Sequence, residues 1–144
     1  MITLIYHSVA VNTYLTEELN VFLSTIRKKN IQLNITGALF YYNGNILQIV
    51  EGECDIVNAL FEKIKIDNRH TDVAKLVDFK ITERSYQDWS MVFIQLNEKD
   101  WVKVEGCLNI EKKQIGLPEH SEKSVYLKVL IDSFINENEA IFNQ

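Results

Sequence analysis

Apolar residues recur along residues 1–97 with two different periods, and these periods predict the secondary structure. Two segments repeat apolar residues at helical spacing, residues 16–30 and 55–66. Five other segments are rich in branched and aromatic side chains, as strands are. The predicted strands span residues 2–8, 35–42, 45–51, 76–82 and 91–96. The expected order is therefore strand, helix, strand, strand, helix, strand, strand.

The pair Asn43-Gly44 separates the second and third predicted strands. Both residue types tolerate positive φ, which a tight hairpin turn requires, so these two strands are expected to pair directly. A hairpin between two helices gives the ferredoxin-like βαββαββ order. This is an α+β fold whose two helices lie on one face of the sheet.

The third predicted strand is apolar on both sides. Ile46 and Val50 lie on one side, and Leu47 and Ile49 lie on the other. A sheet that is apolar on both faces must be covered on both faces. The two helices cover only one face, so an apolar helical stripe over residues 124–142 is the predicted cover for the second.

The chain is expected to form one compact domain with two parts. Residues 1–97 would be the core, and residues 98–144 would be a C-terminal helical extension. Between the last predicted strand and the tail helix, residues 97–123 are more polar. They are expected to be a connection with a short helical piece.

Charge and composition exclude several classes of function. The net charge is −5, and no basic stripe exists to neutralise a phosphate backbone, so nucleic acid is not an expected partner. Cys54 and Cys107 lie far apart, and no cysteine or histidine has metal-ligand spacing, so no metal site is expected. We find no signal peptide and no membrane-length apolar run, and we expect a soluble cytoplasmic protein.

Three polar residues stand out against this apolar background. Gln48 interrupts an apolar strand, Tyr6 shares a strand face with Ile2 and Leu4, and Asn30 ends the first helix. A buried amide without a partner costs roughly 1–3 kcal/mol, so Gln48 must be hydrogen-bonded. The pattern alone favours a structural network, or a role of Asn30 as a helix C-cap, over a binding site.

The other candidate residues can also be explained without a functional site. Arg69 and His70 follow the second helix and could hold a phosphate, although such a pair is more often part of a solvated loop. Glu51 and Glu53 are interpreted as surface charges rather than as an acid–base pair.

Together and in order, these residues resemble the BLUF domain, a flavin-binding sensor of blue light. The resemblance covers about residues 2–97 and leaves the tail outside. The elements Gln-x-x-Glu-Gly, Arg-His and Trp-Ser-Met are specific as an ordered set. The matching stretches are residues 4–8, 30, 35–37, 47–52, 67–70 and 84–91.

The resemblance implies a non-covalently bound flavin, which we take to be FAD, with FMN and riboflavin as alternatives. Tyr6 would bond to Gln48, Gln48 would reach the ring near N5 and O4, and Asn30 would bind the polar edge of the ring. Arg69 and His70 would lie at the ribityl-phosphate end. The implied cofactor-binding set is Tyr6, Phe22, Asn30, Ile46, Gln48, Lys63, Ile64, Asp67, Arg69 and His70.

The implied mechanism is a light-driven change at Tyr6 and Gln48. An excited flavin is a strong oxidant, and a phenol within hydrogen-bond reach can supply an electron and then a proton. After the charges recombine, the Gln48 amide can settle in a form that bonds the ring carbonyl more strongly and shifts absorption to the red. Trp89 and Met91, which the pattern alone assigns to core packing, would relay this change.

The expected output is an altered protein–protein interaction rather than catalysis. No output enzyme follows the core in these 144 residues. We therefore expect an unidentified downstream protein as partner, or a homo-oligomer formed through the C-terminal helix, and neither nucleic acid nor a membrane. The main alternative is a light-independent, small-ligand-binding regulatory module of the same fold. An acylphosphatase-like enzyme is disfavoured, because residues 9–15 lack a glycine-rich phosphate cradle.

The chain departs from the family pattern at two positions. Asn34 stands where glycine is frequent, and asparagine tolerates positive φ, so this change is mild. Ile46 replaces a common aromatic residue, which affects ring packing but removes no hydrogen bond.

Overall fold

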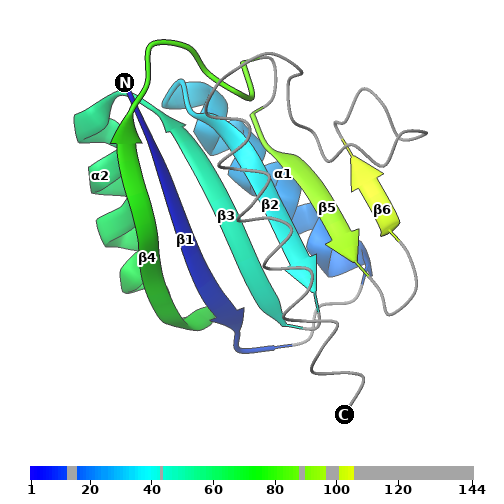
Figure 1. The fold of residues 1–144 in the computed structure, drawn as a ribbon. Coiled ribbons are helices and arrows are strands. Elements are labelled where there is room, and N and C mark those ends of the chain that lie inside the picture. The colour runs from blue at the N-terminus through cyan, green and yellow to red at the C-terminus, as the bar shows by residue number, and fades with distance from the viewer. Residues whose placement is uncertain (13–15, 43, 88–89, 97–100, 106–144) are drawn as a thin grey trace.

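Six strands form one sheet in the part of the chain that the structure, a computed structural model, describes (Figure 1). The described residues are 1–12, 16–42, 44–87, 90–96 and 101–105. The strands are β1 (Ile2–Ala10), β2 (Thr36–Tyr42), β3 (Asn45–Gly52), β4 (His70–Lys80), β5 (Val92–Leu96) and β6 (Trp101–Glu105), and the helices are α1 (Thr16–Gln32) and α2 (Cys54–Lys65). The order of elements through β5 is the predicted one.

The sheet has the strand order β4-β1-β3-β2-β5-β6. β1 lies between β3 and β4 and is antiparallel to both. β2 is antiparallel to β3 and parallel to β5, and β6 extends the edge antiparallel to β5. The first four strands and the two helices form the predicted ferredoxin-like α+β fold, with further strands added beside β2.

Two residues adopt the positive φ that the sequence led us to expect. Gly44 has a φ of 86° in the turn that joins β2 to β3, while its neighbour Asn43 lies outside the described residues. Asn34 has a φ of 52° just before β2, which explains why asparagine can replace glycine there. The hairpin pairs Tyr42 with Asn45 and so sets the register of β3.

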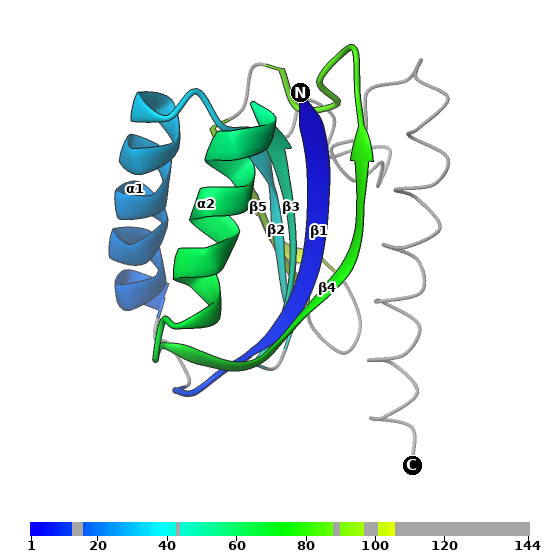
Figure 2. The ribbon, with the colours of Figure 1, turned by 90° about the vertical axis from the view of Figure 1, so that its left-hand side faces the viewer.

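Both helices pack on the same face of the sheet (Figure 2). α1 has Glu17 and Glu18 in its first turn and Lys29 in its last turn, as the helix dipole favours. α2 buries Val57 and Phe61. The apolar spacing that predicted each helix therefore also marks the side that each turns to the sheet.

Two apolar clusters lie on this helical face of the sheet. The first contains Ile2, Leu4, Tyr6, Ile35, Val50, Val57 and Phe61, and the second contains Leu23, Leu39, Tyr41, Ile46, Met91 and Phe93. α2 contributes to the first cluster and α1 to the second. The region between the clusters is therefore also the region between the two helices.

The opposite face of the sheet is buried as well. Ile5, Leu47 and Ile49 point to that face, and each is at most 1% exposed. The prediction that both faces are covered is thereby confirmed. The helix predicted over residues 124–142 falls outside the described residues and stays a prediction.

Two strands differ from the prediction. β4 begins at His70 rather than at residue 76, because an edge strand tolerates polar residues and its first half has no apolar pattern. Residues 101–105 form β6, although they were expected to belong to a connection with a helical piece. α1 also runs two residues beyond Asn30, to Gln32.

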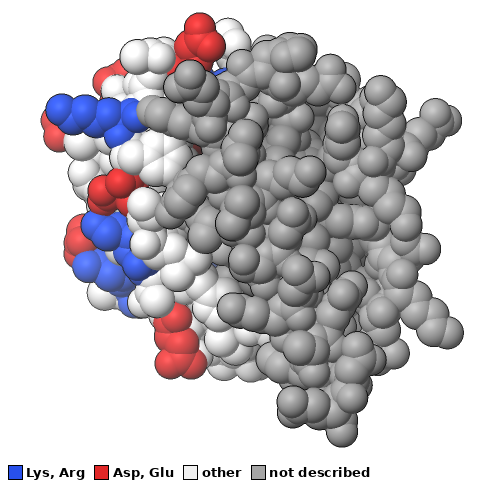
Figure 3. Space-filling view, viewed as in Figure 1, with Lys and Arg blue, Asp and Glu red and all other residues white. Residues whose placement is uncertain are grey.

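The described surface carries charges of both signs. Figure 3 shows basic and acidic side chains interspersed along the visible described edge of the molecule. On β4, Lys75 pairs with Asp78 at 2.7 Å. None of the helices in the described ranges is both long enough and apolar enough to cross a membrane.

Candidate functional site

Tyr6 and Gln48 meet on adjacent strands at the centre of the sheet. The register of β1 and β3 places them directly opposite each other. The Tyr6 hydroxyl donates a hydrogen bond to Oε1 of Gln48, and both side chains are buried. Burial, together with the charge of Asp67, raises the pKa of the Tyr6 hydroxyl well above its usual 10.0, so the phenol keeps its proton and acts as the donor.

The other end of the Gln48 amide contacts Met91. Nε2 of Gln48 donates to Sδ of Met91 at 3.9 Å, and the Met91 side chain is buried. Met91 directly precedes β5, whose pairing with β2 begins at Val92. Tyr6, Gln48 and Met91 thus form a continuous hydrogen-bonded chain from β1 through β3 to the residue that precedes β5.

Helix α1 holds the backbone just before β5. Nδ2 of Asn30 donates to the carbonyl oxygen of Ser90 at 2.7 Å, and Nε of Arg27 donates to the carbonyl oxygen of Met91 at 3.0 Å. Asn30 is buried and points into the layer between α1 and the sheet. The sequence pattern alone suggested that Asn30 caps the end of the helix, but α1 continues to Gln32 and the Asn30 side chain binds the Ser90 carbonyl.

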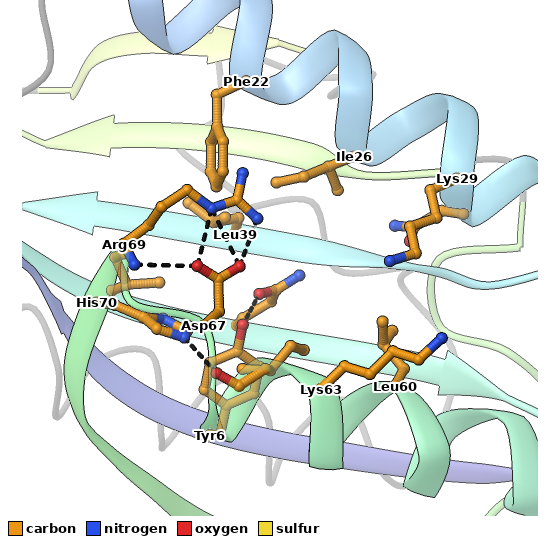
Figure 4. Close-up of a pocket in the computed structure, with 14 residues that line it drawn as sticks. Tyr6, Phe22, Ile26, Lys29, Leu39, Leu60, Lys63, Asp67, Arg69 and His70 are labelled. Atoms are coloured by element: carbon orange, nitrogen blue, oxygen red, sulfur yellow. Dashed lines mark hydrogen bonds and ion pairs between the residues drawn. The ribbon is translucent and has the colours of Figure 1, made fainter.

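A pocket opens between α1 and α2, and Tyr6 and Gln48 are among the residues that line it (Figure 4). Apolar side chains from both helices and from β2 and β3 form its walls. Basic side chains lie on both sides, with Lys29 on α1 and Lys63 on α2. The lining residues are Tyr6, Phe22, Ile26, Lys29, Asn30, Leu39, Ile46, Gln48, Leu60, Lys63, Ile64, Asp67, Arg69 and His70.

Asp67 and Arg69 form an ion pair at one end of the pocket. Nε of Arg69 lies 3.0 Å from both carboxylate oxygens of Asp67, and Nη2 lies 2.5 Å from Oδ2. Hydrogen bonding from Arg69 lowers the pKa of Asp67 to about 2. The Arg69 guanidinium also lies 4.7 Å from the centre of the Phe22 ring, so the pair spans the gap between α2 and α1.

His70 is fixed by two contacts at the start of β4. Its Nε2 lies 2.6 Å from the carbonyl oxygen of Ile64, and because a carbonyl only accepts, Nε2 must carry a proton. Its Nδ1 lies 3.2 Å from Oγ of the buried Ser8. The ring stands edge-on to Tyr6 with centroids 6.4 Å apart. His70 is therefore a part of the pocket rather than a residue of a solvated loop.

The structure brings together every residue of the implied cofactor-binding set, because all ten line this one pocket. The sequence reasoning missed four further lining residues, Ile26, Lys29, Leu39 and Leu60. Ile26 lies one helical turn from both Phe22 and Asn30, so the helical period could have identified it. Trp89, the second proposed relay residue, lies outside the described residues.

Glu51 corrects the sequence interpretation. It was taken for a surface charge, yet its side chain is 0% exposed. Its carboxylate accepts hydrogen bonds from the backbone amides of Ser85 and Tyr86, at 2.8 and 3.0 Å, and from the hydroxyl of Thr36 at 3.2 Å. Burial raises the pKa of Glu51 against the opposing effect of these bonds. Glu51 ties the turn before β5 to the sheet, while the neighbouring Glu53 is exposed as expected.

The side chains of the pocket suit a planar ring with one polar edge and an anionic tail. Most of the apolar lining residues are aliphatic, and the Gln48 and Asn30 amides offer both donors and acceptors. Lys29, Lys63 and Arg69 supply positive charge around it, which would suit a phosphate. A flavin has this combination of features.

A family model independently matches residues 1–92 of the chain. Its description is "Sensors of blue-light using FAD", and its short name is BLUF. The matched range contains Tyr6, Gln48 and Met91 and ends where β5 begins. More than half of the chain is thus covered by this one model.

Known proteins whose names refer to light are similar to most of this chain. The photoactivated adenylate cyclase subunit beta of Euglena longa is 39% identical over 90 residues, which are 62% of this chain and 10% of that protein. The solved structure named "BlsA photo-activated state" is 37% identical with a TM-score of 0.63, covering 67% of this chain and 70% of that chain. A bacterial light-regulated adenylyl cyclase is 29% identical with a TM-score of 0.64, covering 99% of this chain and 36% of that one.

Proposed function

The chain belongs to the BLUF family of blue-light sensors, and on this premise we propose that it holds a flavin in the pocket between α1 and α2 and reports light through Tyr6, Gln48 and Met91. The observation that carries the proposal is the hydrogen-bonded chain from the Tyr6 hydroxyl through the Gln48 amide to the Met91 sulfur. The phenol and the amide are hydrogen-bonded to each other, and both line a pocket whose side chains suit a flavin.

We propose FAD as the cofactor, following the description of the family. Phe22, Ile46 and Ile64 would pack on the ring, and Asn30 and Gln48 would bind its polar edge. The tail would lie toward the remaining polar residues, with Arg69 and His70 nearest the ribityl and phosphate groups. The other charged residues that line the pocket are Lys29, Lys63 and Asp67.

When bound, the flavin supplies absorption of blue light and an electron-accepting ring. Tyr6 would donate an electron to the flavin, and its hydroxyl proton would move along the hydrogen bond toward Oε1 of Gln48. Return of both the electron and the proton to Tyr6 would leave no net oxidation. The Gln48 amide would then remain in a new form, whose stronger hydrogen bond to the ring would shift absorption to the red.

The rearranged amide must disturb its neighbours, because the protein interior is close-packed. Met91 is the first neighbour on the path, since Nε2 of Gln48 donates to its sulfur. A coupling of about 1–3 kcal/mol suffices to bias an interface. We propose that the output is a changed interaction with another protein, and that the sensor region itself catalyses no reaction. The names of the cyclase relatives support this division between light sensor and effector.

An absorption spectrum tests the proposal. The protein is purified, soaked with excess FAD, FMN or riboflavin in separate samples, and freed of unbound flavin. We expect a yellow protein whose visible bands shift reversibly to the red after blue illumination. A protein that stays colourless with all three flavins would instead favour the light-independent regulatory module. A yellow protein with no light-induced shift would contradict the role of Tyr6 and Gln48.

A further inference from the structure

Two successive carbonyl groups just before β5 are hydrogen-bonded from one side of α1. Asn30 binds the Ser90 carbonyl and Arg27, three residues earlier on the helix, binds the Met91 carbonyl. Residues three apart on a helix are neighbours on its surface, so the two donors act side by side. Helix α1 thus holds the backbone of Ser90 and Met91, directly before the first residue of β5.

Met91 therefore has contacts in two directions. Its sulfur accepts from Gln48, while its carbonyl accepts from Arg27. Pairing of β5 with β2 begins only at the next residue, where Val92 stands opposite Ala38. The position of the Met91 sulfur relative to the Gln48 amide thus depends on the hydrogen bond from Arg27.

Arg27 differs from Asn30 in one useful respect. Asn30 lines the pocket, so its replacement would change flavin binding directly. Arg27 is not among the residues that line the pocket, although it is partly buried on the same helix. A change at Arg27 can therefore reach the Gln48 amide through Met91 while leaving the pocket lining intact.

We propose that Arg27 is a positioning residue, which holds Met91 against Gln48 and so makes α1 part of the light response. This inference rests on the proposed function. Without the hydrogen bond from Arg27, Met91 should be more mobile next to Gln48. The activation barrier for return of the rearranged Gln48 amide to its dark form should then be lower. The expected result is a faster dark recovery at an unchanged flavin content.

Three replacements separate the hydrogen bond from the charge. Arg27→Leu removes the donor, and Arg27→Ala repeats the removal with a residue that favours helices, in case leucine disturbs packing. Arg27→Gln places an amide nitrogen at the same position along the side chain as Nε, so it retains a donor without the charge. Lys28→Gln is the matched control, because Lys28 is exposed on the same helix and loses the same charge.

Dark recovery is measured by absorption after blue illumination. Arg27→Leu and Arg27→Ala are expected to recover roughly three- to tenfold faster than the unaltered protein, the range that one net hydrogen bond can produce. Arg27→Gln and Lys28→Gln are expected to recover at nearly the original rate. In a Met91→Ala background, Arg27→Leu should have no further effect. The proposal would be overturned if Arg27→Leu, Arg27→Ala and Arg27→Gln all recovered at the same rate. It would also be overturned if Arg27→Leu accelerated recovery as much in the Met91→Ala background as in the unaltered protein.

A second readout does not depend on light. The chain has two methionines, Met1 and Met91, so labelling the methionine methyl groups with ¹³C gives two resonances. The Met91 resonance should shift in Arg27→Leu and return in Arg27→Gln, while that of the exposed Met1 stays constant. An unaltered protein that shows no red shift would refute the proposed function, whereas an unmoved Met91 resonance in Arg27→Leu would refute this inference alone.

Discussion

Tyr6 and Gln48 stand directly opposite each other on β1 and β3, and the Tyr6 hydroxyl donates to the Gln48 amide. Their meeting depends on register, because a slip by one residue would turn either side chain to the other face of the sheet. The turn at Gly44 sets the register of β3 against β2. The Tyr6–Gln48 contact also requires the pairing of β1 with β3, two strands that are distant in sequence.

Tyr6→Phe tests the donor in this pair. The ring keeps its packing against Phe61, so we expect flavin to remain bound, but the light-induced red shift to be lost. The unpaired Gln48 oxygen should lower the free energy of unfolding by about 1–3 kcal/mol. Illumination spectra and denaturant titrations measure the two effects. Tyr41→Phe, on β2, is the control and should shift normally; a normal shift in Tyr6→Phe would disprove the role of the phenol.

Arg69→Leu tests whether the charged end of the pocket binds a phosphate. We expect the affinity for FAD and FMN to fall about tenfold and that for riboflavin, which has no phosphate, to change little. Added salt should reduce the loss of FAD and FMN affinity that the substitution causes, because salt screens the attraction between Arg69 and a phosphate. Flavin fluorescence titrations provide the measurement. Lys65→Leu is the control, since Lys65 is a nearby exposed cation that does not line the pocket. Equal losses for all three flavins would argue against a phosphate contact.

Glu51→Ala tests the buried carboxylate behind the turn before β5. The backbone amides of Ser85 and Tyr86 would lose their acceptor, so we expect a loss of about 2–4 kcal/mol in the free energy of unfolding. Urea titration measures it. Glu53→Ala, two residues away and exposed, has no side-chain cap bond to lose and should cost less than about 0.5 kcal/mol. Similar losses in the two variants would contradict the assigned contacts.

The raised pKa of Glu51 predicts a dependence of stability on pH. The folded protein holds this proton more tightly than the unfolded chain, for which the ordinary value is 4.5. The contribution to stability is therefore complete below about pH 4.5 and is lost as the pH rises through the folded-state pKa. Glu51→Gln cannot titrate, so unfolding free energies of the two proteins should diverge over this range. Parallel curves from pH 4 to 8 would show that the pKa is not raised.

The sequence predicted those site residues that are polar side chains within an otherwise apolar strand pattern. Gln48 is an amide within an apolar strand, and Tyr6 follows Ile2 and Leu4 on one face, so both could be placed in the core from periodicity. Their assignment to a flavin pocket came from the family resemblance and not from the pattern. The polar start of β4 left no periodic signal, because that strand is exposed at the edge of the sheet.

Glu51 could not have been identified in the same way. Its acidic neighbour Glu53 and the adjacent Gly52 are typical of a surface turn. Its partners are backbone amides 34 and 35 residues later, and backbone groups leave no mark in the sequence. The contacts of Arg27 and Asn30 with carbonyl groups were hidden for the same reason.

The central claim is that the Gln48 amide converts light absorption into a structural change. The most direct measurement is the light-minus-dark absorption difference of the unaltered protein and of Gln48→Leu, compared at equal flavin occupancy. We predict a reversible red shift in the unaltered protein and none in Gln48→Leu, whose apolar side chain can neither donate to the ring nor accept from Tyr6. A red shift of the same size in Gln48→Leu would contradict the account.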